Sequence, residues 1–74
     1  MNRAYETKFG KNIRELREQK HLTQEEMSAK LQLRGCDITR SAYAKLEVGQ
    51  RHFYPDEIKQ IKEILNVSYD ELFI

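Results

Sequence analysis

The sequence predicts a small all-α protein, and three observations lead to that fold class. Apolar residues recur at helical spacing in almost every segment, and no long stretch alternates with the period of two that a strand requires. Two segments open with a hydroxyl residue followed three positions later by glutamate, which is the pattern of a helix capping box. The chain has 74 residues, so we expect one domain over residues 1–74 with a small core.

Start and stop signals define the first three of five expected helices. The first covers about residues 5–19, with one apolar stripe along it. The second begins after Thr23, whose side chain and that of a following glutamate can satisfy free N–H groups of the first turn. Gly35 is expected to end it, because glycine adopts the left-handed backbone found after helices. The third helix begins after Thr39, a favourable N-cap residue, and ends at Gly49.

The last two helices follow a short loop. Pro55 suits the first position of a fourth helix, because its missing N–H has no partner there in any case. Asn66 is a suitable stop, and Ser68 can cap a short fifth helix. This last helix is expected to bury Leu72 and Phe73.

The third helix has two different faces. At about 100° per residue, its side chains separate into two arcs of the helical wheel. The outward arc is polar and consists of Arg40, Ser41, Ala44 and Lys45. The inward arc is apolar except for one carboxylate and one hydroxyl, and consists of Ala42, Tyr43, Leu46 and Glu47. Arginine and lysine can donate to guanine O6 and N7 in the DNA major groove, although two cations also suit an ordinary solvated helix face.

Charge is distributed unevenly along the chain. The net charge is only +1, but residues 1–52 carry a net +4 and residues 53–74 a net −3. Such a division suits a protein with one anionic partner surface. It is equally compatible with a solvated domain that has no such partner.

Several classes of protein receive no support from the composition. The single cysteine, Cys36, cannot form an intramolecular disulfide or a cysteine-rich metal site, and we expect it in a turn. No apolar run reaches membrane-spanning length, and the start of the chain lacks an apolar signal core. We therefore expect a cytoplasmic protein that is not an enzyme and uses no metal, cofactor or small-molecule ligand.

Three separated runs carry a resemblance to a known family. They are Leu22-Thr23-Gln24-Glu25-Glu26-Met27-Ser28, then Ile38-Thr39-Arg40-Ser41, then Lys45-Leu46-Glu47-Val48-Gly49. Together with the ending of the chain, they resemble the phage-repressor/Cro-type helix-turn-helix family from about Phe9 to Phe73. The resemblance implies a compact five-helix, lambda-repressor-like domain with the helix-turn-helix at helices two and three. It also implies a small transcriptional regulator, most often a repressor, that binds double-stranded DNA sequence-specifically as a homodimer.

The resemblance assigns roles to particular residues. The third helix, about residues 40–47, would enter the major groove. Base contacts are expected from Arg40, Ser41, Ala44 and Lys45. Phosphate contacts are expected from Gln24, Thr39, Arg34 and Arg51, and less strongly from His52, Asn12 and Lys11. Arg17 and Glu47 would form a partly buried ion pair, the alternative being a Glu47 side chain that is exposed at a frayed helix end.

One segment departs from the family pattern. The connection over residues 31–38 is about five residues longer than the short turn of a usual helix-turn-helix. We expect most of the extra length to extend the second helix by about a turn, with Leu33 adding apolar contact, and the rest to widen the turn. This places Arg34 near the DNA side.

A second class of function remains open from the sequence. The near-neutral net charge also suits a protein-interaction module, or an antitoxin-like adaptor, that keeps the fold without reading DNA.

Overall fold

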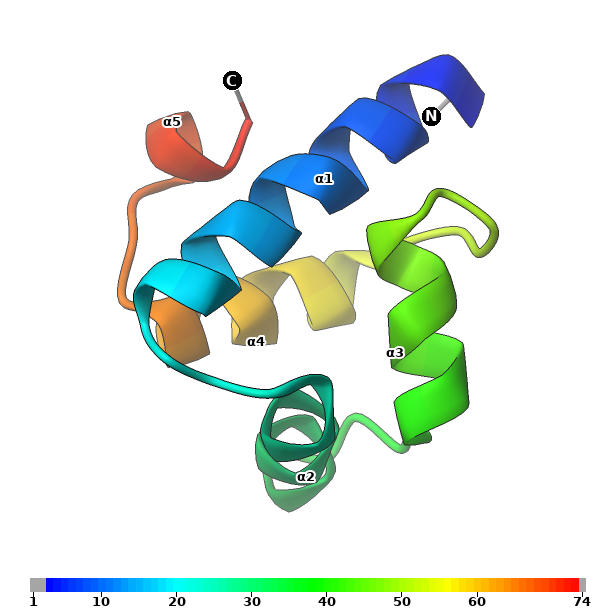
Figure 1. Cartoon of the computed structure of the whole chain (residues 1–74). Coiled ribbons are helices and arrows are strands. Elements are labelled where there is room, and N and C mark those ends of the chain that lie inside the picture. The colour runs from blue at the N-terminus through cyan, green and yellow to red at the C-terminus, as the bar shows by residue number, and fades with distance from the viewer. Residues whose placement is uncertain (1–2, 74) are drawn as a thin grey trace.

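Five helices make up the part of the chain that the structure describes, residues 3–73 of a computed structural model. Their bounds in chain order are α1 Arg3–Gln19, α2 Gln24–Leu33, α3 Arg40–Glu47, α4 Pro55–Leu65 and α5 Tyr69–Leu72. Helix α1 packs against α3 and α5, and α2 packs against α3 and α4. Figure 1 shows α2 and α3 together at one end of the molecule, with α5 beside α1 away from them. The all-α, five-helix prediction is confirmed.

Local capping explains where several helices begin and end. The Thr23 hydroxyl accepts from Glu26 N at 3.0 Å, and the Glu26 carboxylate accepts from Thr23 N at 2.9 Å. Ser68 and Glu71 repeat this reciprocal arrangement at the start of α5. Asn66 ends α4 in the left-handed conformation, with φ of 55°. These bounds follow from residues that lie within a few positions of each helix end, which is why the sequence predicts them.

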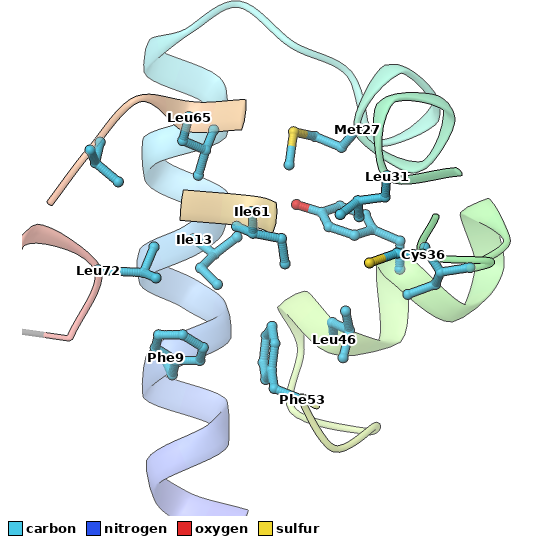
Figure 2. Packing of buried hydrophobic residues seen from close by; sticks show 13 residues of the cluster. Phe9, Ile13, Met27, Leu31, Cys36, Leu46, Phe53, Ile61, Leu65 and Leu72 are labelled. Atoms are coloured by element: carbon cyan, nitrogen blue, oxygen red, sulfur yellow. The ribbon is translucent and has the colours of Figure 1, made fainter. Parts of the chain in front are cut away.

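The core lies between the helices and draws on all five of them. Figure 2 shows apolar side chains from α1, α2, α4 and α5 converging on the middle of the molecule. The most deeply buried side chains are Ile13, Met27, Leu31, Ile38, Tyr43, Leu46, Ile61, Leu65 and Leu72. Because α3 contributes two of these side chains, its inward arc is held by the same core that holds the rest of the molecule.

Two expectations about single residues are corrected, and a third, the position of Cys36, is confirmed. Leu33 adds no core contact, because it is 88% exposed, about 200° around α2 from the buried Leu31. Phe73 is only partly covered, at 37% exposed, although its ring stacks on Phe9 with centroids 4.7 Å apart. Cys36 does lie in the turn after α2, but its side chain is buried in the core cluster.

Within residues 3–73, none of the helices combines the length and the apolar character that crossing a membrane requires.

Candidate nucleic-acid interface

Helix α3 presents the two faces expected from the helical wheel. Tyr43, Leu46 and Glu47 are buried, while Arg40, Ser41 and Lys45 are exposed and Ala44 is half-buried. The Thr39 hydroxyl accepts from Ala42 N at 3.1 Å and so caps the start of the helix. The cap matters because a helix of eight residues has few internal hydrogen bonds to hold its first turn.

A buried ion pair anchors the other end of α3. Arg17 Nε donates to Glu47 Oε2 at 2.7 Å, and Arg17 Nη2 donates to Glu47 Oε1 at 3.1 Å. The remaining amino group of Arg17 donates to the Leu22 carbonyl at 2.6 Å. The pairing expected from the sequence is therefore present, and the alternative of an exposed Glu47 does not apply, since this residue is 3% exposed. The two-pronged geometry fixes the direction of α3 relative to α1.

Gln24 joins the same network from the start of α2. Its amide donates to Glu47 Oε1 at 3.0 Å, so that one carboxylate connects three helices. Burial acts to raise the pKa of Glu47, but the hydrogen bonds to its carboxylate, those of Arg17 foremost, outweigh burial and lower the pKa below its usual value. The hydrogen bonds that Arg17 donates to Glu47 raise the pKa of Arg17. Burial raises the pKa of the neighbouring Tyr43 phenol, so the charge of the network stays on Arg17 and Glu47.

A hollow lies where the end of α1 meets the starts of α2 and α3. Its lining includes Gln24 and Arg40, two residues that the sequence singled out, and Arg14 and His21, two that it did not. Arg14 lies on α1 five residues before its end, and His21 lies two residues after it. Nothing in the local pattern separates them from other surface residues, so only the packing of α1 against the other helices could reveal their position.

Two expected phosphate-contacting arginines have protein partners. Arg34 Nη1 donates to Glu63 at 2.9 Å and to Gln60 at 3.1 Å, so its guanidinium lies against α4. Arg51 forms a two-pronged pair with Glu57, at 2.8 and 3.0 Å, and the hydrogen bond raises the pKa of Arg51. Phosphate contacts from Arg34 and Arg51 stay predictions. A DNA phosphate would have to compete with these carboxylates for each guanidinium group. Neither pair was predicted from the sequence: the Arg34–Glu63 pair joins residues 29 positions apart, and the Arg51–Glu57 pair depends on how the loop after α3 folds back onto α4.

The weaker candidates also differ in their surroundings. Asn12 is buried, and its amide donates to the carbonyls of Glu71 and Leu72 at 2.9 and 2.7 Å, so it holds α5 against α1. His52 lies on the loop after α3, where its Nδ1 is 2.8 Å from the buried carboxylate of Glu6. Lys11 is exposed on α1. Asn12 therefore serves the packing of the molecule instead of a surface contact.

Over residues 3–73 no group of three histidine, cysteine, aspartate or glutamate side chains is placed to hold a metal ion.

Helices α2 and α3 are joined by a turn, and α3 is short, anchored at its far end and polar on its outer face. This arrangement defines the class of helix-turn-helix domains. The comparison with known families agrees, since a family model described as "Helix-turn-helix domain" matches residues 10–73. The chain belongs to this family.

One curated relative is significantly similar to the chain. It is the "Uncharacterized HTH-type transcriptional regulator YqaE" of Bacillus subtilis (strain 168), and the two are 41% identical over 64 residues. The match covers 86% of this chain and 51% of the relative, so the chain spans about half the length of that protein. No solved structure matches the chain at a significant level.

Proposed function

We propose that this chain is the DNA-binding domain of a transcriptional regulator, and that α3 reads a specific sequence in the major groove. The observation that carries the proposal is the exposed arc of Arg40, Ser41 and Lys45 on a helix whose other face is locked into the core. Base reading needs donors held in one orientation, because a misplaced guanidinium loses its two hydrogen bonds to guanine. Family membership and the name of the Bacillus subtilis relative favour the same function.

Thr39 and Gln24 are proposed to contact phosphates on either side of the groove. Thr39 lies at the exposed N-cap of α3, and Gln24 lines the hollow beside Arg40. Helix starts attract phosphate because their free N–H groups point outward and carry partial positive charge. Such contacts set the register of α3 on the duplex without reading bases.

The proposal extends to a repressor that acts as a homodimer. Dimeric helix-turn-helix proteins place two recognition helices one turn of DNA apart, about 34 Å, and so read an inverted repeat. A bound dimer of this size covers the DNA that a polymerase would otherwise contact, which is the simplest way for a small domain to lower transcription.

Selection from a randomised duplex pool tests sequence-specific binding. We expect the protein to enrich an inverted repeat whose half-site includes guanine. Arg40→Ala combined with Lys45→Ala should reduce affinity for that sequence by at least about tenfold, since each good base contact contributes about 1–3 kcal/mol of discrimination. Lys30→Ala combined with Lys59→Ala is the matched control, because it removes the same charge from exposed positions on α2 and α4.

The control double variant should bind the enriched sequence nearly as well as the unaltered protein. An unaltered protein that enriches no sequence would contradict the proposed function. Equal binding by the two double variants would contradict the role of α3.

A protein-interaction module is the second candidate, favoured by the net charge of +1. Salt separates the two functions, because a protein that neutralises several phosphates releases counterions and loses affinity steeply as salt rises. An interface of apolar contacts with a protein partner would respond weakly to salt.

A further inference from the structure

The connection between α2 and α3 is long but closely held. It runs over residues 34–39, and its backbone is tied to α2 by hydrogen bonds from Cys36 N to Leu31 O at 2.9 Å and from Gly35 N to Gln32 O at 3.1 Å. The side chains of Cys36 and Ile38 are both buried. Gly35 itself has a φ of +90°, a conformation that glycine adopts without strain. The extra residues therefore form an ordered connection with several anchors.

One side chain of α2 reaches across this connection. Gln32 Nε2 donates to the carbonyl oxygen of Ile38 at 2.8 Å. That carbonyl belongs to the peptide that enters Thr39, the N-cap of α3. The orientation of this peptide sets the direction in which α3 leaves the turn, because the N-cap is the last residue before helical geometry begins. The Gln32 amide thus holds the peptide group that immediately precedes the recognition helix.

Helix α3 is tied to α2 by a glutamine at each of its ends. Gln24, the first residue of α2, donates to Glu47 at the last residue of α3, and Gln32, near the end of α2, donates to the residue before Thr39. Figure 1 shows how α2 and α3 lie next to each other with the connection at their shared end. The two amides therefore constrain both ends of α3, which is about 12 Å long.

We propose that Gln32 is a positioning residue that sets the angle at which Arg40 and Ser41 meet DNA. The inference rests on the proposed function and goes beyond it, because Gln32 need not touch DNA. A binding residue must be held within about 0.5 Å and 10–20° of its productive geometry, and hydrogen bonds from neighbouring side chains provide that restraint. In a usual helix-turn-helix a short turn restrains the direction of the recognition helix. Here the connection is long, and we infer that the Gln32 amide provides this restraint.

Gln32→Met is the decisive variant, because methionine is similar in length and helix propensity but cannot donate. We expect the ratio of affinities for the enriched sequence and for a scrambled duplex to fall about three- to tenfold, the range for one lost hydrogen bond. Binding to the scrambled duplex itself should stay within about twofold, since phosphate contacts and net charge are unchanged. Gln19→Met, at the exposed end of α1, is the matched control and should leave the ratio unchanged.

Amide hydrogen exchange in the free protein supplies a second readout that involves no DNA. The N–H groups of Ala42 and Tyr43 are bonded to Thr39 in the first turn of α3, so they should exchange faster in Gln32→Met than in the Gln19→Met control. Faster exchange at every helix would instead indicate a general loss of stability. That pattern, with an unchanged affinity ratio, would overturn the positioning role.

The outcomes separate this inference from the proposed function. If the unaltered protein selects a sequence and Gln32→Met selects it with the same ratio, the positioning role is wrong and the proposed function stands. If the unaltered protein selects no sequence, both are wrong.

Discussion

Among single residues, Glu47 holds the helix that carries the proposed interface. Its carboxylate is buried and receives hydrogen bonds from Arg17 and Gln24, so it connects α3 to both α1 and α2. A buried charge that loses its partner is strongly unfavourable, because neither water nor a counter-charge then stabilises it. The pair thus acts less as a source of net stability than as a geometric lock, since a misaligned α3 would leave the carboxylate unpaired.

Arg17→Met should lower the free energy of unfolding by about 3–5 kcal/mol, because Glu47 stays buried without its cation. Chemical denaturation followed by circular dichroism measures the change. Arg14→Met is the matched control: the Arg14–Glu18 pair is exposed, with a separation of 3.7 Å, and such pairs contribute at most about 1 kcal/mol. Combining Arg17→Met with Glu47→Leu should recover most of the loss, as buried pairs replaced by apolar residues often do. Equal stability of the Arg17→Met and Arg14→Met variants would contradict the lock.

At the scale of the helices, short elements depend on their ends. Helix α5 spans four residues and α3 spans eight, so both rely on a capping hydroxyl to begin at a defined residue. Ser68 caps α5 and Thr39 caps α3 with similar hydrogen bonds, both 3.1 Å long. The two caps differ in position, because only the cap of α3 lies at the proposed interface.

Thr39→Ala and Ser68→Ala should each lower the free energy of unfolding by about 1 kcal/mol, the usual effect of losing a capping hydroxyl. Only Thr39→Ala should also weaken binding to the enriched DNA sequence, because it loosens the turn that carries Arg40 and Ser41 and removes the proposed phosphate contact of Thr39. Thermal melting measures the change in stability, and titration of labelled DNA well below the melting temperature measures the affinity. A loss of affinity in Ser68→Ala equal to that in Thr39→Ala would indicate that stability alone controls binding.

At the scale of the whole molecule, α1 is the element against which α3 is aligned. Gly10 lies on α1 where the helix meets the end of α3, and a Cβ atom there would collide with the backbone carbonyl oxygens of Leu46 and Glu47. The close approach of the two backbones brings Arg17 within reach of Glu47 further along α1. On the other side of α1, Asn12 holds α5, so one helix positions both α3 and α5.

Gly10→Ala should destabilise the protein by about 1–3 kcal/mol, the usual effect of overpacking a tight contact. The direction of this change in stability is informative, because replacing glycine by alanine would stabilise an isolated helix by about 1 kcal/mol. Lys11→Ala, at the next position but exposed, should change stability by no more than about 0.5 kcal/mol. Urea denaturation of the three proteins measures the difference. A stabilising Gly10→Ala would show that α1 and α3 do not approach this closely.

The sequence predicted the helices and the two faces of α3 because these depend on neighbouring residues. Caps at Thr23, Thr39 and Ser68 act within one turn, and the arcs of α3 follow from the helical repeat alone. The Arg17–Glu47 pair could be predicted only from the family resemblance. Leu33 was misassigned although the same helical repeat places it about 200° from the buried Leu31, on the solvent side of α2.

Sequence alone thus determined an all-α chain with a short polar-faced helix after a capped start, since hydrogen bonding and periodicity at that scale are local. Tertiary structure decided which partners the polar side chains take. Arg34 and Arg51 pair with acidic residues of α4, and Gln32 reaches the carbonyl of Ile38. The Arg34–Glu63 contact joins residues 29 positions apart and depends on how the helices share one core. The other two contacts join residues six positions apart and depend on how the chain between them folds back.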